Sequence, residues 1–592
     1  MCGIVGFFGV DDAVSMVIDG LEKLEYRGYD SAGIAYKTTN QFNIVKDKGR
    51  VLALQSKLEE HCFSDLAIGH TRWATHGEPN AINAHPHKSL NHRFIIVHNG
   101  IIENYQSLKF EYLKDYEFQS ETDTEIMVDL IEYFSLELSV CDAIRKTMSV
   151  IEGSYACLVL DTEDFDHIYF FKNESPLLLG KRANGIGFAS DLTGLIGKMD
   201  EYMVLDDKTV GIASRDDFKI FDMVGFSKEI KLNPISIKLE EINKKNYEHY
   251  MLKEIDEQPM LIRNLIHHYF DKDEMNIDQH LINKIRRCDK INFVASGTSM
   301  YACLLAKYYF EKLCGIPSEV FCASELVYST PLISKRPFFI FLSQSGETAD
   351  SIMVMQKIKK QNHPILTITN TKESTMVRLS DYYLDIYAGK EIAVASTKAY
   401  TTMIVVCAIL ARAVSGDKTN LKNNLKAVSF AMEKVLSHKE LYRGIAEEIS
   451  KSSDLFYIGR GIDYWTALEA SLKLKEIAYI HTEAFSSGEL KHGPIALITE
   501  GTPVIAIITQ EGTNMITRSN LLETEARGAK TYIISSKGLS LPSDDIIIPN
   551  VAHYLSPLVS VIVVQLIAYY ASVIRNNDVD KPKNLAKSVT VQ

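Results

Sequence analysis

The chain has 592 residues, 46% of them hydrophobic, and carries 64 Lys and Arg against 76 Asp and Glu, a net charge of −12. At roughly 100 to 200 residues per domain, this length predicts about three to five compact parts. The acidic balance and the lack of a long basic run argue against nucleic acid as a partner, because binding to phosphates needs clustered lysine and arginine.

The patterns of an exported protein, of a membrane span and of a metal site are missing from the sequence. The start of the chain has no signal-peptide pattern, and nine scattered cysteines without a CxxC pair fit reduced thiols, so we expect a cytoplasmic protein. The most apolar stretch, residues 557–574, contains Gln565 and two tyrosines, which predicts a buried helix and no membrane partner. Six histidines between residues 70 and 98 lack ligand spacing, so no metal site is expected.

The first part of the chain, up to about residue 235, alternates short strands, such as RFIIVHNG and YACLVLD, with helical stretches. This pattern predicts layered α/β structure. Residues 236–259 are charged and helical in pattern, without the Gly and Ser of a flexible tether. We therefore expect a first domain over residues 1–239 and a linker over residues 240–259.

The second part of the chain contains a duplicated pattern of strand, glycine turn and helix. INFVASGTS and LFYIGRG each precede a helix, and Glu325 follows Gly297 by 28 residues, as Glu489 follows Gly461. The duplication predicts two related units, each a mostly parallel sheet wrapped by helices, with ligands at the carboxyl ends of the strands. The expected limits are residues 260–430 and 431–575, with a tail over residues 576–592.

The sequence begins MCGIVGFFG, which places a cysteine at the edge of an apolar run. If Met1 is removed, Cys2 carries both a thiol and an α-amine with a reference pKa of about 7.7 to 8.0. One residue would then supply nucleophile and base, as in N-terminal threonine enzymes. The alternative is an inert cysteine packed in a strand, and the first residues alone leave both interpretations open.

Five motifs follow in order: EYRGYDSAG, GHTRWATHGEPN, HPH, VHNGIIEN and SETDTE. Each alone is compatible with turns and helix caps. Together they resemble the glutaminase domain of the N-terminal-nucleophile glutamine amidotransferases. The resemblance implies that Cys2 attacks the side-chain amide of glutamine, while Asn99 and the backbone N–H of Gly100 form the oxyanion hole.

The same resemblance implies a binding pocket for glutamine. Arg72 would pair with the α-carboxylate of the substrate and Asp123 with its α-ammonium group. A planar guanidinium suits a carboxylate, in agreement with the first role. Three further residues would line the pocket: Trp73, Thr75 and His76.

LSQSGET, at residues 342–348, stands where an apolar strand becomes a helix. Backbone N–H groups at a helix start, with serine and threonine hydroxyls, can bind an anion, although a serine-rich helix cap has the same pattern. The duplicated frame, with ASGTS and VASTKA, resembles sugar isomerase (SIS) domains, which bind phosphosugars. The residues expected to bind the sugar phosphate are Ser299, Ser343, Gln344, Ser345, Thr348 and Ser396.

The last cluster is LKLKEIAYIHTEAFSSGELKHGP, at residues 472–494. Glu469, Lys473 and Glu476 share one helix face, and taken alone they predict a solvated stripe of salt bridges. With GELKHGP and the ending DKPKNLAKSVTVQ, the second half resembles the isomerase part of the glutamine–fructose-6-phosphate aminotransferase (isomerising) family. The resemblance covers essentially the whole chain. Ser296, where many members carry Cys, and Gln592, where Glu is common, are small departures.

This resemblance implies that ammonia passes from L-glutamine through a sealed passage to D-fructose 6-phosphate, giving D-glucosamine 6-phosphate and L-glutamate. His492 would open the sugar ring, Glu476 would move a proton between C1 and C2 with the help of Lys473, and Lys587 would form a Schiff base with the open-chain ketone. In the family the histidine comes from a neighbouring subunit, so a homodimer is implied. No metal or organic cofactor is implied.

The fold implied is a four-layer αββα N-terminal-nucleophile hydrolase domain followed by two three-layer αβα doubly wound SIS domains. Two alternatives remain. An amidotransferase that feeds ammonia to phosphoribosyl pyrophosphate would share the N-terminal half but carry a different acceptor domain. A non-catalytic phosphosugar-binding sensor would not need Cys2, Glu476, His492 and Lys587 together.

Overall fold

The computed structural model describes residues 2–39, 41–59, 62–74, 76–114, 116–235, 244, 246–272, 274–329, 333–417 and 420–589. The chain divides into two compact units. Unit 1 comprises residues 1–243 with 588–592, and unit 2 comprises residues 244–587. The finer limits expected for the linker, the two repeats and the tail remain predictions.

Unit 1 contains two antiparallel sheets. The strands of the first, in spatial order, are β14 (Asn233–Pro234), β11 (Glu201–Val204), β9 (Leu178–Arg182), β10 (Gly185–Ala189), β1 (Gly3–Phe8), β4 (Leu66–Arg72), β2 (Ser31–Lys37) and β3 (Phe42–Lys48). Those of the second are β13 (Phe218–Phe221), β12 (Thr209–Ala213), β8 (Asp164–Asn173), β7 (Gly153–Asp161), β6 (Phe94–Ile102) and β5 (His87–Lys88).

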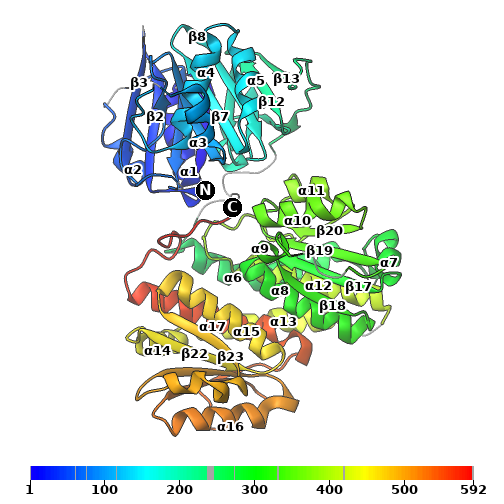
Figure 1. Cartoon of the computed structure of the whole chain (residues 1–592). Helices are drawn as coiled ribbons and strands as arrows, with labels where there is room; N and C mark the ends of the chain where they lie inside the picture. The colour runs from blue at the N-terminus through cyan, green and yellow to red at the C-terminus, as the bar shows by residue number, and fades with distance from the viewer. Residues whose placement is uncertain are drawn as a thin grey trace. The chain divides into compact units, whose positions relative to one another are not determined.

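The two sheets of unit 1 pack face to face, and helices cover their outer faces (Figure 1). Ile4, Val97 and Leu158 lie in the core between the sheets. Helices α1 (Ala13–Leu24) and α2 (Val51–Gln55) pack on the first sheet. Helices α3 (Tyr105–Tyr112), α4 (Asp123–Ser135) and α5 (Val140–Val150) pack on the second. The predicted four-layer αββα arrangement is confirmed.

Strand β1 explains the apolar run that follows Cys2. All six of its residues are buried, because it lies in the middle of the first sheet between β10 and β4 and contacts a core on each face. A strand buried on both faces reads as a continuous apolar run. The strand and the candidate nucleophile are therefore compatible, since Cys2 immediately precedes the strand.

Unit 2 contains two five-stranded parallel sheets with the same strand order. The first consists of β18 (Ser318–Cys322), β17 (Lys290–Ala295), β19 (Pro337–Ser343), β20 (Ile365–Thr369) and β21 (Tyr382–Asp385). The second consists of β23 (His481–Ser486), β22 (Asp454–Gly459), β24 (Pro503–Ile508), β25 (Lys530–Ser536) and β26 (Ile546–Ile548). The predicted duplication is confirmed.

Helices cover both faces of each parallel sheet, so each repeat has the expected αβα layers (Figure 1). Most of the longer helices share one core that is continuous through both repeats. They are α6 (Tyr250–Tyr269), α7 (Gln279–Arg286), α8 (Gly297–Tyr309), α12 (Lys398–Ser415), α13 (Leu421–Leu436), α14 (Lys439–Ile449), α15 (Ile462–Lys473) and α17 (Ser556–Ile574). The outer faces carry α9 (Ala323–Leu326), α10 (Ala349–Lys360), α11 (Thr375–Leu379) and α16 (Asn514–Glu525).

Helices α12 and α17 are long and apolar enough to cross a membrane by length and composition. Their apolar windows are 94% and 83% buried inside the protein, and both helices lie in the shared core of unit 2. An apolar helix that is covered by its own protein needs no lipid. The prediction of a buried helix over residues 557–574 is confirmed.

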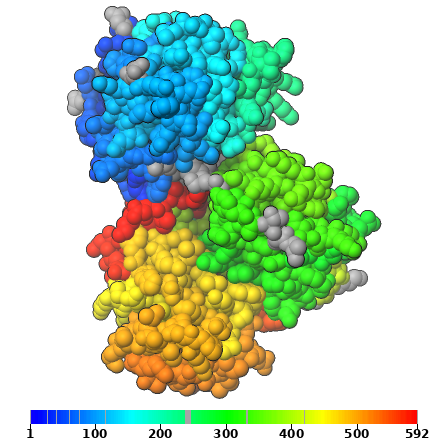
Figure 2. Space-filling view, viewed as in Figure 1, coloured from blue at the N-terminus to red at the C-terminus, as the bar shows by residue number. Residues whose placement is uncertain are grey.

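The start of unit 2 and the tail are joined at the first turn of α6. Asp580 accepts hydrogen bonds from the backbone N–H groups of Tyr250 (2.8 Å) and Met251 (2.9 Å). The tail also contacts the second repeat, where the hydroxyl of Tyr479 accepts from the Lys583 N–H at 2.7 Å. Figure 2 shows the tail, in red, on the surface of the yellow second repeat. The end of unit 2 is therefore anchored at two places.

Leu158→Ala should lower the free energy of unfolding of unit 1 by about 2 to 5 kcal/mol, because it leaves a cavity between the two sheets. Leu158 is fully buried, whereas Leu52, the control, is 74% exposed. The chain has two tryptophans, Trp73 in unit 1 and Trp465 in unit 2. In a Trp465→Phe background, urea unfolding followed by Trp73 fluorescence therefore reports on unit 1. Equal midpoints for Leu158→Ala and Leu52→Ala would contradict this packing.

Candidate active sites

Cys2 lies where the end of strand β4 meets the start of strand β1. Its Sγ accepts a hydrogen bond from the Trp73 N–H at 3.3 Å. Its carbonyl oxygen accepts from Asn99 Nδ2 at 3.0 Å and from Arg27 Nε at 3.1 Å. Burial raises the pKa of the Cys2 thiol, although nearby positive groups oppose this. The site therefore holds a neutral thiol, which needs a base before it can act as a nucleophile.

Asn99 and Gly100 lie next to each other in strand β6. Gly100 has a φ of 134°, and a Cβ atom there would lie 1.9 Å from the carbonyl oxygen of Ser154 in the neighbouring strand. Only glycine fits this position without a shift of the backbone. The Oδ1 atom of Asn99 is buried and has no hydrogen-bond partner among the described residues. The predicted oxyanion-hole pair thus lies next to Cys2.

The predicted glutamine-binding residues surround the same end of the sheet. The Arg72 guanidinium donates to backbone carbonyl groups of residues 76–78, at 3.4 Å for Gly77 and 3.5 Å for Glu78. Asp123, the first residue of α4, accepts from the Ile102 N–H at 2.8 Å. Trp73 packs edge-on against Tyr29, and His76 packs edge-on against Tyr105. Thr75 lies outside the described residues.

Four of the six histidines of the region stack together in the interior of unit 1. The rings of His70 and His85 lie 4.1 Å apart, and His70 Nε2 contacts the His98 carbonyl oxygen at 2.8 Å. Burial lowers the pKa of all four, that of His70 to about 3, so they are neutral. Among the described residues no group of His, Cys, Asp and Glu has an arrangement that could hold a metal ion.

The predicted phosphate-binding turn lies at the carboxyl end of strand β19. Ser343 Oγ accepts from the Gly346 N–H at 3.0 Å and contacts Thr348 Oγ1 at 3.0 Å. Ser345 Oγ accepts from the Glu347 N–H at 3.2 Å, and helix α10 begins directly after Thr348. Gly346 has a φ of 66°, and a Cβ atom there would lie 2.1 Å from Ser374 Oγ. The turn is therefore tight and rich in hydroxyl groups.

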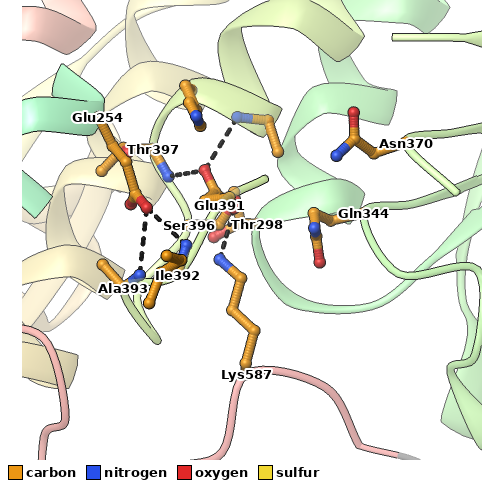
Figure 3. A network of polar contacts seen from close by, with 12 residues as sticks. Glu254, Thr298, Gln344, Asn370, Glu391, Ile392, Ala393, Ser396, Thr397 and Lys587 are labelled. Atoms are coloured by element: carbon orange, nitrogen blue, oxygen red, sulfur yellow. Dashed lines mark hydrogen bonds and ion pairs between the residues drawn. The ribbon is translucent and has the colours of Figure 1, made fainter. Parts of the chain in front are cut away.

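The other predicted sugar-phosphate residues lie on neighbouring segments of the first repeat. Ser299 is in the first turn of α8, and Ser396 Oγ donates to Glu391 at 3.0 Å. Figure 3 shows Gln344 and Ser396 near the end of the Lys587 side chain. Close to these segments, Ser296 has a buried hydroxyl without a hydrogen-bond partner among the described residues. A buried orphan hydroxyl indicates room for a ligand or water.

The second repeat differs from the first at the corresponding strand ends. In the repeat alignment, Asp463 and Thr509 take the places of Ser299 and Ser343, and Glu511 follows where the first repeat has a serine. The buried Asp463 carboxylate accepts from the Thr509 N–H at 2.8 Å and from the Thr509 hydroxyl. The second repeat thus places its own carboxylate where the first repeat has the candidate anion site.

Lys473 forms the centre of a buried charged cluster between the two repeats. Its Nζ lies 2.6 Å from Glu476, 3.0 Å from Thr298 Oγ1 and 3.4 Å from Glu469. The Lys473 and Glu469 side chains are 0% exposed, so the alternative interpretation of this helix face, a solvated stripe of salt bridges, does not hold. The stripe is covered because α8 of the first repeat packs on α15.

The two glutamates of this cluster differ in charge. Burial raises the pKa of Glu469 to about 8 against the opposing effect of Lys473, so this carboxyl is neutral at pH 7. Burial alone would lower the pKa of Lys473, but the adjacent carboxylates raise it instead. Glu476, at 2.6 Å, is therefore the carboxylate that pairs with the Lys473 ammonium. It lies in a π-helical turn, Leu474–Ala478, a feature often found at functional sites.

His492 lies apart from this cluster. It ends a short 3₁₀ turn, Glu489–His492, and its side chain is exposed. Among the described residues, His492 forms no hydrogen bond or ion pair that would join it to Lys473 or Glu476. The structure of one chain therefore does not bring together all residues predicted for the sugar reaction.

Lys587 reaches back from the tail into the first repeat (Figure 3). Its side chain is 4% exposed, and Nζ lies 2.5 Å from Glu391 Oε2. Sequence reasoning identified the lysine but missed Glu391, although it lies five residues before Ser396. Nothing in the local spacing indicates a contact between residues 196 positions apart. Thr298 and Glu254 were missed for the same reason.

Comparisons with known proteins agree with this division. A family model described as a SIS domain matches residues 284–413 and 448–575, and one described as a glutamine amidotransferase domain matches residues 70–197. Proteins named glutamine–fructose-6-phosphate aminotransferase [isomerizing] are similar over 100% of both chains, with 49% identity in Listeria monocytogenes and 48% in Shouchella clausii and Staphylococcus aureus.

One solved structure is similar to the second half of the chain. It is the C-terminal domain of glucosamine-fructose-6-phosphate aminotransferase from Francisella tularensis, with 36% sequence identity and a TM-score of 0.55. The match covers 57% of this chain and 100% of that chain.

Lys473→Ala should lower the free energy of unfolding of unit 2 by about 3 kcal/mol, because it leaves buried carboxyl groups without their cation. We place it at the lower end of the range for buried pairs, since Glu469 is already neutral. Trp465, also on α15, reports the transition in a Trp73→Phe background. The control is Arg443→Ala, which breaks the exposed pair with Glu447. Equal effects of the two substitutions would contradict the buried cluster.

Proposed function

Because the chain belongs to the glutamine–fructose-6-phosphate aminotransferase (isomerising) family, we propose that it transfers ammonia from L-glutamine to D-fructose 6-phosphate. The products are L-glutamate and, after isomerisation, D-glucosamine 6-phosphate. One observation supports this most directly: the same chain carries a cysteine beside the predicted oxyanion pair and a tail lysine whose side chain is buried against Glu391 in the first repeat. A sensor of phosphosugars would need neither the cysteine nor the lysine.

The glutaminase reaction begins at Cys2 after removal of Met1. The free α-amine takes the proton of the buried thiol, and Sγ attacks the carbonyl carbon of the glutamine side chain. Asn99 Nδ2 and the Gly100 N–H stabilise the oxyanion, and the α-ammonium returns its proton to the leaving nitrogen, so that ammonia departs and a thioester forms. Water then hydrolyses the thioester, which releases L-glutamate and restores the Cys2 thiol. The amide of Asn99 now donates to the Cys2 carbonyl group, so it must turn toward the substrate.

Recognition of glutamine requires a rearrangement around Arg72. The Arg72 guanidinium now contacts backbone carbonyl groups of residues 76–78. When glutamine binds, the α-carboxylate of the substrate takes the place of these carbonyl groups and pairs with the guanidinium. Asp123 pairs with the α-ammonium group. Trp73 and His76 form side walls of the pocket.

The sugar phosphate binds at the turn after β19. The hydroxyl groups of this turn and the N-terminus of α10 supply donors without a nearby arginine or lysine in the motif. We infer that a phosphate bound there directs the rest of the sugar toward Lys587, whose side chain is held in the same repeat by Glu391. The proposed phosphate ligands are Ser299, Ser343, Gln344, Ser345, Thr348 and Ser396.

The isomerisation uses two chains. His492, exposed and without a partner among the described residues of its own chain, opens the sugar ring bound by a neighbouring copy, so the active form is a homodimer. Glu476 moves the proton between C1 and C2, and Lys473, whose Nζ lies 2.6 Å away, holds the Glu476 side chain in position. Lys587 forms a Schiff base with the ketone at C2, whose oxygen leaves as water, and ammonia then displaces the lysine amine from C2. The enzyme works in the cytoplasm without metal or organic cofactor.

The experiment that tests the function uses glutamine labelled with ¹⁵N in the amide. Purified protein is incubated with this glutamine and fructose 6-phosphate, and the sugar phosphates are analysed by mass spectrometry. We expect the label in a hexosamine phosphate. Label only in free ammonia would leave a glutaminase with another acceptor, and no release of label would favour the sensor.

Cys2→Ala should abolish glutamine hydrolysis and leave the binding of fructose 6-phosphate unchanged, because the two sites lie in separate units. Cys141→Ala, on helix α5, is the control and should keep both properties. Hydrolysis is followed by glutamate release and sugar binding by calorimetry. Residual hydrolysis at the wild-type rate would rule out Cys2 as the nucleophile.

Lys587→Arg should lose synthesis of the amino sugar while glutamine hydrolysis persists, because arginine keeps the charge but forms no imine. Borohydride added with fructose 6-phosphate should trap an adduct on Lys587, located by peptide mapping. The control is Lys583→Arg, since Lys583 lies in the same tail but packs over the Tyr479 ring. An adduct on Lys473, or none in the wild type, would contradict the Schiff base.

A further inference from the structure

Glu391 is the carboxylate that holds the Lys587 side chain. Among the described residues, the other hydrogen bonds of Glu391 are to residues 396–399. One oxygen lies 2.5 Å from Lys587 Nζ and 3.0 Å from Ser396 Oγ. The other accepts from the N–H groups of Thr397 and Ala399, both at 3.0 Å, at the start of α12. Both oxygens are occupied, and the side chain is 0% exposed. The position of the carboxylate is therefore fixed.

The groups around Glu391 keep it ionised. Burial would raise the pKa of Glu391, but Lys587 and the backbone N–H groups outweigh it and lower the pKa to about 2. The start of helix α12 also favours a negative charge. Lys398, on the same helix, pairs with Glu257 at 2.8 Å. Lys587 is thus the cation that contacts the Glu391 carboxylate.

A second buried glutamate lies close by but is neutral. Glu254, from helix α6, accepts from the N–H groups of Ile392 (2.5 Å) and Ala393 (3.3 Å) with one oxygen, as Figure 3 shows. Its other oxygen has no hydrogen-bond partner among the described residues. Burial and the nearby Glu391 raise its pKa to about 8. Glu254 therefore supports the segment that carries Glu391 without adding a second negative charge at pH 7.

We propose that Glu391 is the counter-ion of the protonated Schiff base, and that it holds the nitrogen of Lys587 both as an ammonium and as an iminium ion. This inference rests on the Schiff-base step proposed above. The lysine ammonium first gives up one proton to free its lone pair, and the amine then adds to the ketone carbon. The bond from carbon to oxygen breaks, and the oxygen leaves as water with two protons, one of them the proton that the ammonium gave up. The nitrogen keeps one proton and one positive charge. Glu391 therefore faces one positive charge before and after the step.

A fixed counter-ion has a specific chemical consequence. A carboxylate next to the iminium nitrogen stabilises the protonated imine relative to the neutral one. The protonated form is the stronger electrophile at carbon, and it is also the form that borohydride reduces. Glu391 thus acts on the charge of the intermediate, a role that a merely structural contact would not have.

The test uses Glu391→Gln, which keeps an oxygen for the N–H groups of Thr397 and Ala399 but removes the charge. Full-length protein is incubated with fructose 6-phosphate and borohydride between about pH 6 and pH 10, and the adduct on Lys587 is measured by mass spectrometry. We expect about tenfold less adduct at pH 7.5, and a loss of trapping that sets in about one pH unit lower than in the wild type, since one unit of pKa corresponds to tenfold.

Two matched variants separate charge from packing. Glu254→Gln replaces a neutral carboxyl in the same network and should trap the adduct as the wild type does near pH 7. Glu391→Asp keeps the charge and should recover trapping relative to Glu391→Gln. Trp465 fluorescence and glutamine hydrolysis check that each variant is folded.

The outcomes are distinct. Wild-type trapping and an unchanged pH profile in Glu391→Gln would overturn the counter-ion, as would an equal loss in Glu254→Gln, because the effect would then be structural. Folded Glu391→Asp that traps no better than Glu391→Gln would also contradict it. If the wild type itself gives no adduct but still transfers labelled nitrogen, the Schiff-base step is contradicted. The proposed transfer of ammonia to the sugar is then still supported.

Discussion

Two lysine side chains buried in unit 2, Lys473 and Lys587, each need a counter-charge, and much of the surrounding structure follows from this constraint. Lys473 pairs with Glu476 and Lys587 with Glu391. In both places a second glutamate lies nearby with a raised pKa and is neutral. An uncompensated buried charge would cost several kcal/mol. One ionised carboxylate for each ammonium keeps the net charge of each cluster near zero.

This charge balance connects segments that are far apart in the sequence. Thr298 on α8 of the first repeat contacts Lys473 on α15 of the second, so these two helices share a buried polar site. The tail is held at Asp580 by the first turn of α6 and at Lys587 by the segment before α12. Helix α6 in turn supports that segment through Glu254. The tail lysine is therefore positioned by three separate parts of unit 2.

The sequence predicted the fold well where local pattern and repetition carry the information. The duplicated strand and turn motifs correctly indicated two sheets of the same order, and the apolar run after Cys2 correctly indicated a buried strand. Gly346 could be placed in a turn, but not the close approach of Ser374 that forbids a side chain there. Such contacts come from packing and leave no local signal.

The candidate sites were predicted less completely, for the same physical reason. The helix face with Lys473 looked solvated because its periodicity cannot show that another repeat covers it. Glu391 and Glu254 belong to no motif, and their opposite charge states depend on burial and on which donors reach them. The roles expected for Cys2, Lys587 and the serines of the phosphate turn came from the family resemblance. The structure adds the neighbouring groups on which those roles depend.

Asp463 marks a difference between the two copies of the duplicated unit at matching strand ends. A strand end whose N–H and hydroxyl donors already serve its own acidic side chain no longer offers those donors to a free anion. Two repeats with the same strand order therefore need not carry two equivalent ligand sites.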